Sequence, residues 1–177
     1  MKLKFENQAF QLDAIASTVN LFNGMQSLAL SEQLANQNEI LSYDLVANGL
    51  QLNELQLLKN LQSIQLLNSL ENYATELYYG EYAFKRKDDA GNEIEPLIKI
   101  PNVSIEMETG TGKTYVYLRT AFELNKRYGL TKFIVVVPSD AIRAGVLKSL
   151  EITKEHFKSE YNNVSYDYYQ YDSEKIS

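Results

Sequence analysis

The residue types with the clearest chemistry stand together near the middle of the chain, in the run Glu106-Met107-Glu108-Thr109-Gly110-Thr111-Gly112-Lys113-Thr114. Glycines permit backbone dihedrals that are closed to other residues, so their amide N–H groups can approach phosphate oxygens. A lysine ammonium can reach the β- and γ-phosphates of a nucleotide, and a threonine hydroxyl can ligate magnesium. The run therefore predicts a P-loop for ATP and Mg2+. The candidate phosphate-binding residues are Thr109, Gly110, Thr111, Gly112, Lys113 and Thr114, with Thr114 as the magnesium ligand and Lys113 as the catalytic cation.

This motif departs from the standard pattern GxxxxGK(S/T) at one position, where Met107 replaces the first glycine. Its surroundings are those that the motif requires. Residues 103–107 are predicted to form a short strand, and residues 113–128 a helix that ends at Gly129. The positive end of that helix would face the phosphates. The alternative is a chance Gly-Thr-Gly-Lys-Thr sequence in a surface loop, and the flanking elements favour the nucleotide site.

The residues after the motif predict further alternation of strand and helix. Residues 133–137 form a continuous apolar, β-branched run, which is typical of a strand buried on both faces. Pro138 ends this run, and Ser139 or Asp140 can cap a following helix with apolar residues from Ile142 to Leu150 on one face. Residues 164–171 would form a third strand. This order predicts an α/β fold with a parallel sheet and crossover helices.

The residues before the motif predict a different organisation. Residues 8–23 have the pattern of an amphipathic helix, and residues 50–79 carry a leucine stripe that predicts one long helix or two. A core-facing helix is the favoured interpretation of that stripe, and partner binding is the alternative. Residues 82–100 predict a β-hairpin around a turn-rich centre. The basic cluster at residues 85–87 indicates a solvated face, with phosphate contact as the alternative.

Composition excludes several classes of protein. The chain has 177 residues and a formal net charge of -6, with 23 acidic and 17 basic residues, so it lacks the basic excess of a dedicated nucleic-acid module. There is no cysteine and one histidine, which excludes disulfides and thiolate metal sites. The N-terminus is not followed by an apolar stretch, and no run is long enough to span a bilayer. We therefore expect a cytoplasmic protein.

Three segments together resemble one family. Residues 107–118, which contain the P-loop, are similar to the restriction subunit of type III restriction-modification enzymes, whose motor belongs to the superfamily-2 helicases. Phe10-Gln11-Leu12-Asp13-Ala14-Ile15 resembles the glutamine motif of that family. Residues 136–146 resemble its motif Ia. The resemblance extends from Leu3 to about Phe157 and is weakest over residues 26–80.

The resemblance implies a fold and a division of the chain. Residues 1–25 would be an N-terminal helix with the glutamine motif, and residues 26–100 a helical insertion and hairpin before the P-loop strand. Residues 101–177 would be the first, incomplete part of a RecA-like ATPase domain 1. It implies that Gln11 reads the adenine edge with Phe10 near the base, and that Ser139 and Arg143 contact the DNA backbone. ATP and Mg2+ would be the cofactors, and double-stranded DNA and a modification methyltransferase subunit the partners.

Each of these residues also has a structural interpretation. Gln11 can be a polar position of the first helix, and Ser139 and Arg143 can be a cap and an exposed charge. Glu106 is expected at an inward or edge position of a strand and Glu108 in a loop. The histidine, residue 156, is expected on a helix surface. The tyrosines at 166, 168, 169 and 171 are expected to pack in a strand, with base stacking as the alternative.

Hydrolysis in such motors needs an acid that positions magnesium and water, and an arginine finger. We find neither in a recognisable motif, so the sequence predicts an N-terminal fragment without turnover of its own. Three other interpretations stay open. They are another superfamily-2 helicase or a type I restriction motor subunit, a small nucleotide or metabolite kinase, and a non-catalytic interaction module built on the leucine-rich helix.

Overall fold

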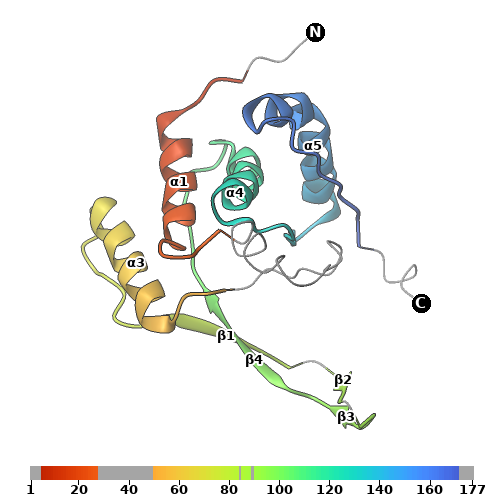
Figure 1. Ribbon diagram of the computed structural model, residues 1–177. Coiled ribbons are helices and arrows are strands. Elements are labelled where there is room, and N and C mark those ends of the chain that lie inside the picture. The colour runs from red at the N-terminus through yellow and green to blue at the C-terminus, as the bar shows by residue number, and fades with distance from the viewer. Residues whose placement is uncertain (1–4, 28–49, 84, 89, 172–177) are drawn as a thin grey trace, which may run out of the picture. The chain divides into compact units, whose positions relative to one another are not determined.

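The computed structural model describes residues 5–27, 50–83, 85–88 and 90–171 (Figure 1). The chain divides into two compact units, and each is described by itself. The first unit spans Gln8–Lys132, and the second consists of Met1–Asn7 with Phe133–Ser177. The described elements are α1 (Ala9–Asn20), α3 (Glu54–Leu67), β1 (Tyr78–Ala83), β2 (Arg86–Lys87), β3 (Glu93–Ile94), β4 (Leu97–Asn102), α4 (Lys113–Tyr128) and α5 (Asp140–Glu160).

Helices α1, α3 and α4 share the core of the first unit. The predicted helix over residues 8–23 is confirmed as α1, which buries Ile15 and Val19. A cluster of buried side chains joins these to the other two helices. Its members are Ile15, Val19, Leu21, Met25, Leu52, Leu57, Leu77, Val116, Leu124, Tyr128 and Leu130. Burial of this apolar area is what holds the three helices together.

The leucine stripe forms a shorter helix than its spacing predicts. Helix α3 ends at Leu67, and Ser69 has a positive φ of 56°, so the predicted continuation toward residue 79 is wrong. Leu57 is buried and Leu58, Leu61 and Ile64 pack against the core cluster, which supports the core-facing interpretation. Leu55, Leu66 and Leu67 are exposed instead. The spacing of three residues drifts around a helix of 3.6 residues per turn, so one face cannot hold the whole stripe.

The start of α3 offers a test of local stability. The Asn53 side chain caps the helix by accepting a hydrogen bond of 2.9 Å from the Gln56 amide. Because alanine cannot accept this bond, Asn53→Ala should lower the free energy of unfolding by about 1 kcal/mol. Urea unfolding followed by circular dichroism measures the change. Asn53→Asp should keep the cap, and equal losses for both variants would contradict this assignment.

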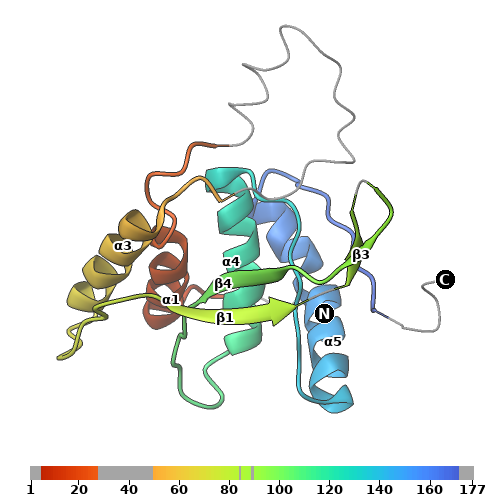
Figure 2. The same ribbon diagram turned by 90° about the horizontal axis from the view of Figure 1, so that it is seen from below.

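The predicted hairpin is confirmed, with longer strands than expected. Strands β1 and β4 pair antiparallel, with a register from Tyr78 opposite Asn102 to Ala83 opposite Leu97 (Figure 2). The short strands β2 and β3 continue the ribbon. At the tip the Asp88 carboxylate accepts hydrogen bonds from the amides of Ala90 and Asn92, at 3.0 and 2.8 Å. These bonds hold the pKa of Asp88 below its usual value.

The three strands predicted on either side of the P-loop are not formed in the structure. Residues 103–107, 133–137 and 164–171 have no strand pairing, so the described residues form no parallel sheet, and the only strands are those of the hairpin. Ile134 and Val136 are 91% and 88% exposed, although the apolar run predicted burial. A β-branched run indicates an extended backbone, but a strand needs hydrogen-bond partners that are distant in sequence. The observed architecture is a mixed helix and strand fold.

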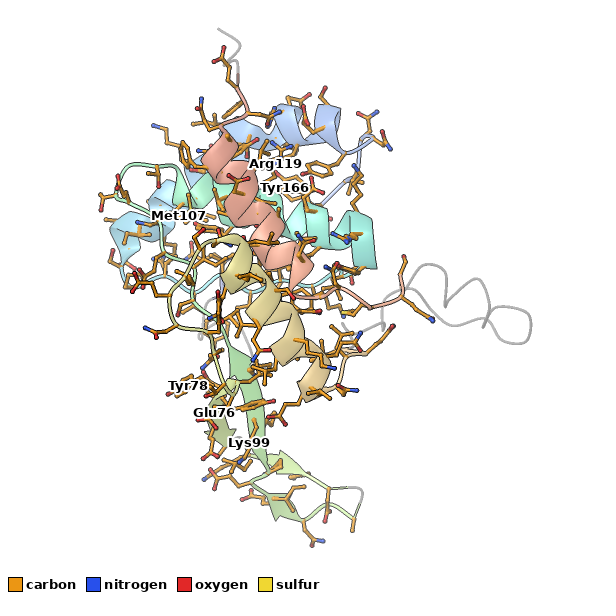
Figure 3. The ribbon with its side chains drawn as sticks, turned by 90° about the vertical axis from the view of Figure 1, so that its left-hand side faces the viewer. Glu76, Tyr78, Lys99, Met107, Arg119 and Tyr166 are labelled. Carbon is orange, nitrogen blue, oxygen red and sulfur yellow. The ribbon has the colours of Figure 1, made fainter. Side chains whose placement is uncertain are left out.

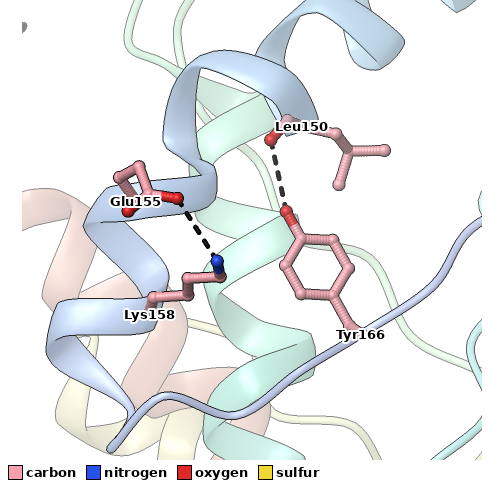
Figure 4. A network of polar contacts seen from close by, with 4 residues as sticks. All are labelled: Leu150, Glu155, Lys158 and Tyr166. Atoms are coloured by element: carbon pink, nitrogen blue, oxygen red, sulfur yellow. Dashed lines mark hydrogen bonds and ion pairs between the residues drawn. The ribbon is translucent and has the colours of Figure 1, made fainter.

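The second unit is built on α5. Ser139 caps this helix and Phe157 is completely buried, and the helix continues ten residues beyond Leu150, to Glu160. The prediction that residue 156 lies on a helix surface is only partly right, because the His156 ring is half-buried and stacks on Phe5 at 4.6 Å. Within this unit, Lys158 pairs with Glu155 at 3.3 Å (Figure 4).

The tyrosines near the end of the described chain do not pack in a strand. The Tyr166 hydroxyl donates a hydrogen bond of 3.2 Å to the carbonyl of Leu150 in α5 (Figure 4). Burial raises the pKa of Tyr166, and Tyr168 adds to this effect. Tyr169 and Tyr171 are exposed. Separately, none of the helices in the described ranges is both long and apolar enough to cross a membrane.

Candidate nucleotide-binding site

The P-loop backbone has the conformation that its glycines allow. Gly110 and Gly112 have positive φ values of 82° and 85°, in the left-handed region that side chains disfavour. The Thr111 hydroxyl between them donates a hydrogen bond of 2.7 Å to the carbonyl of Glu108. This bond closes the loop on itself. Glu108 lies in the loop as expected, whereas Glu106 lies in an exposed loop and not in the expected strand.

The loop leads directly into helix α4. Gly112 is the N-cap residue, and Lys113 is the first residue of the helix. The first turn has no acidic residue and no side-chain cap. The Lys113 side chain is exposed and makes no hydrogen bond or ion pair with any other residue in the described part of the chain. The N-terminal amides of a helix, its dipole and an available ammonium are features that suit an anionic phosphate group.

Gln11 joins helix α1 to this loop. Its side-chain nitrogen Nε2 donates a hydrogen bond of 2.8 Å to the carbonyl of Thr111, across 100 residues of sequence. A Cβ atom at Gly112 would lie 2.6 Å from the same nitrogen, so only glycine leaves room for the amide at this distance. Phe10, the neighbour of Gln11 in the first turn of α1, is 48% exposed. The structure therefore brings the glutamine motif and the P-loop together.

A groove of about 870 Å³ opens beside the loop. Phe10 on α1, Ile64 on α3 and Met107 before the loop line its apolar walls, and Thr111 lies at its edge. Met107 also packs against the core cluster, as its half-buried position indicates (Figure 3). Its side chain thus occupies core space that a glycine would leave empty. Polar residues, among them Asp13, Glu106 and Glu108, line the rest of the groove.

Helices α1 and α4 are also joined at their other ends. The Tyr128 hydroxyl donates a hydrogen bond of 3.1 Å to the carbonyl of Val19. Arg127 donates to the side-chain oxygens of Asn20 and Asn23, at 2.8 and 2.7 Å. Gln11 joins the first turn of α1 to the loop before α4, and Tyr128 joins the last turn of α4 to the last turn of α1. Helix α1 is therefore held against α4 at both of its ends. Sequence reasoning missed the contact between Tyr128 and Val19, whose only signal was a tyrosine on the last turn of a predicted helix.

Tyr128→Phe tests this attachment. Loss of the hydroxyl should lower the free energy of unfolding by about 0.5–1.5 kcal/mol at neutral pH. Burial raises the pKa of Tyr128, with Arg127 acting in the opposite direction. The pKa of Tyr128 is higher in the folded than in the unfolded state. The stabilisation by its hydroxyl is therefore fully present below the unfolded-state pKa of about 10, and it is lost as the pH rises through the folded-state pKa. In urea unfolding, the difference in free energy of unfolding between the wild type and Tyr128→Phe should be smaller at pH 11 than at pH 7. An equal difference at the two pH values would contradict this assignment.

The residues predicted to contact the DNA backbone belong to the second unit. Ser139 is the N-cap of α5 and accepts a hydrogen bond of 3.4 Å from the Ile142 amide. Arg143 is ion-paired with Asp140 at 3.0 Å. These are the structural roles, a cap and a helix charge, that the sequence left open. Contact with DNA remains a prediction for both residues.

Comparison with known proteins places this site in a family. A family model described as "Type III restriction enzyme, res subunit" matches residues 55–176, which include the P-loop. The chain is 36% identical over 130 residues to the type III restriction-modification enzyme EcoPI Res subunit of Escherichia phage P1. It is 49% identical over 61 residues to the EcoP15I Res subunit of Escherichia coli, and 43% over 82 residues to the StyLTI Res subunit of Salmonella typhimurium. The chain belongs to the family of type III restriction enzyme Res subunits.

The matches differ in how much of each protein they cover. They include 72%, 33% and 42% of this chain, but 11%, 6% and 8% of the EcoPI, EcoP15I and StyLTI subunits. The chain therefore spans about a tenth of the length of these curated relatives. No solved structure matches the chain. Membership of the family is thus established by sequence similarity.

Proposed function

We propose that this chain is the N-terminal ATP-binding segment of a type III restriction enzyme, a DNA translocase and endonuclease driven by ATP. The observation that carries the proposal is the P-loop with its positive φ values and available Lys113, in a chain of the Res family. In this proposal residues 1–25 hold the glutamine motif, residues 26–100 are an insertion, and residues 101–177 begin a RecA-like domain 1.

We propose a role for each residue of the site. Backbone N–H groups of residues 109–114 surround the phosphates, and Lys113 neutralises the charge that develops on the β- and γ-phosphates. Thr114, half-buried in the first turn of α4, would ligate Mg2+ through its hydroxyl. Bound magnesium would supply charge neutralisation at the reacting phosphate. In this proposal the base of the same nucleotide binds near Phe10, which lines the groove, and Gln11, which is hydrogen-bonded to the loop.

Turnover requires groups beyond these. A phosphate cradle binds and orients the nucleotide, but hydrolysis also requires an acid for the attacking water and an arginine for the transition state. We propose that other segments of a full-length subunit provide them, and that this segment alone does not hydrolyse ATP. We propose double-stranded DNA and a modification methyltransferase subunit as partners, backbone contacts at Ser139 and Arg143, and a cytoplasmic location.

The dependence of ATP hydrolysis on DNA tests this function. A full-length subunit that carries this segment is combined with its modification subunit, and ATP turnover is measured without DNA, with DNA lacking the recognition site, and with DNA that contains it. We expect turnover to require the site-containing DNA and the modification subunit. Equal rates of ATP hydrolysis with and without DNA would point to a different nucleotide-dependent enzyme and would overturn the proposal.

A further inference from the structure

One face of the ribbon formed by β1 and β4 meets the core of the first unit, and we call it the inner face. Alternate residues of a strand point to opposite faces, and residues directly opposite each other in an antiparallel pair share a face. On the inner face Tyr79 lies opposite Pro101, both are half-buried, and Tyr79 packs against the core cluster. Farther along the same face, Glu81 and Lys99 form an ion pair of 3.1 Å. The inner face is thus covered at its base and charged beyond it.

The opposite face of the ribbon, which we call the outer face, is apolar and exposed. It has no charged residue, and its members are Tyr78, Gly80, Tyr82, Ile98, Ile100 and Asn102. In the described chain Tyr78 is 74% exposed and Tyr82 51%. Ile98 and Ile100 are 41% and 45% exposed. Two aromatic rings and two β-branched side chains therefore lie together in water.

Gly80 allows one of these rings to lie along the ribbon. A Cβ atom at Gly80 would lie 2.7 Å from Cε2 of Tyr82 and 2.8 Å from its hydroxyl oxygen. The side-chain nitrogen of Asn102 would lie 2.7 Å from the same Cβ. The Tyr82 ring thus lies over the glycine and does not stand away from the strand. The outer face presents an aromatic surface on which other apolar side chains can pack.

This distribution of side chains is typical of a ribbon whose outer face is buried. In an antiparallel sheet with one face in water, the charged residues lie on the wet face and the apolar residues on the buried one. A two-stranded ribbon by itself is marginally stable, and packing of a face on another element stabilises it. An apolar face left in water also favours aggregation. The pattern indicates that another element covers the outer face in the working protein.

The size of the outer face indicates the kind of element that covers it. Each strand has six residues, so the ribbon is about 20 Å long and about 10 Å wide. Its area of about 200 Å² is well below the roughly 800 Å² that each partner buries in a stable complex. An element of the same polypeptide needs less area, because the connecting chain keeps its effective concentration high. The chain spans about a tenth of the length of its curated relatives, so most of a full-length subunit lies outside it.

We propose that the outer face of the β1–β4 ribbon is a docking surface for an apolar element of the same full-length subunit. Apolar side chains of that element pack on the two tyrosine rings and the two isoleucines. The inference rests on the proposed function only in taking the chain as a segment of a longer subunit. It gives the hairpin within residues 26–100 a role in the assembly of that subunit, and it involves neither nucleotide nor DNA.

Photo-cross-linking in the full-length subunit identifies what covers the outer face. Tyr78, the most exposed member of that face, is replaced by the photoreactive residue p-benzoylphenylalanine. The matched control carries the same residue in place of Leu97, which is 58% exposed on the inner face. Each protein is irradiated with and without the modification subunit, and cross-linked peptides are mapped by mass spectrometry.

We expect position 78 to cross-link to peptides of the same subunit outside Gln8–Lys132, in a product with the mass of one subunit, at least about threefold more than position 97. Cross-links mainly to the modification subunit or to a second copy would overturn the inference, since the occupant would then be a separate chain. A yield at position 78 no higher than that of the control would show an open face and would also overturn it.

Substitution on each face of β4 provides a second measurement. Ile98 and Leu97 are neighbours with side chains on opposite faces, and both are exposed in the described chain. In the full-length subunit, Ile98→Ser should speed hydrogen exchange of the β1 and β4 amides about tenfold or more, because the docked element loses its packing. Leu97→Ser should speed it about threefold at most. Equal acceleration by the two variants would overturn the inference.

Neither measurement uses nucleotide or DNA, so the two proposals fail separately. An open outer face would leave the proposed ATP-dependent function as it stands. Equal rates of ATP hydrolysis with and without DNA would overturn the proposed function and leave the docking surface as it stands.

Discussion

Replacement of Lys113 by alanine is expected to lower ATP turnover by the full-length subunit about 100-fold or more, in the presence of its modification subunit and site-containing DNA. The ammonium is exposed at the first residue of α4, where it forms no ion pair within the described chain. Alanine removes the positive charge that offsets the negative charge developing on the phosphate, and it leaves the loop backbone intact. Loss of a charge that acts mainly in the transition state lowers kcat.

A second lysine separates this effect from a general loss of charge. Lys59 is an exposed residue of α3, and Lys59→Ala removes the same charge from outside the P-loop. Turnover should be close to that of the wild type in this variant. If Lys113→Ala hydrolyses ATP at the wild-type rate, Lys113 has no part in catalysis, and the assignment of the loop as a functioning P-loop is wrong.

Gly112→Ala is expected to weaken binding of ATP at least tenfold and to destabilise the fold by about 1–2 kcal/mol. Two effects act together. The φ of 85° is unfavourable for alanine, and the new Cβ would lie 2.6 Å from Nε2 of Gln11. The side chain of Gln11 must then move, and its bond to Thr111 is lost. Calorimetric titration with Mg–ATP and urea unfolding of the same protein measure the two consequences.

Gly91 provides the matched control for this variant. It has the same φ of 85° at the tip of the hairpin, and no atom lies within 4 Å of the position of its Cβ. Gly91→Ala should therefore carry a similar backbone strain and leave ATP binding unchanged. If both variants weaken ATP binding equally, strain alone accounts for the loss and the contact with Gln11 has no role.

Elements with local signals were predicted well from the sequence. Helix α4 runs from Lys113 to Tyr128 as predicted, because a glycine with positive φ stands directly before it and another directly after it. The turn residues near Asp88 likewise located the hairpin, whose closing hydrogen bonds lie within the turn. In each case the determining residues are within a few positions of the boundary that they define.

Features that depend on distant residues could not be predicted in the same way. The apolar run at residues 133–137 indicated a strand, but strand formation depends on neighbours that no local pattern specifies. The glutamine motif identified Gln11 as a base contact by resemblance, while its bond to Thr111 depends on how α1 packs against α4. The anchoring bond from Tyr128 to Val19 was missed for the same reason.

Hydrogen exchange of the full-length subunit, with and without a non-hydrolysable ATP analogue and Mg2+, tests the central claim most directly. If the loop binds the phosphates, the amides of residues 109–115 should exchange more slowly in the presence of the nucleotide, because their N–H groups become hydrogen-bonded to phosphate oxygens. Amides in the hairpin, near Gly91, should be unaffected. Saturating nucleotide that leaves exchange at residues 109–115 unchanged would contradict the account.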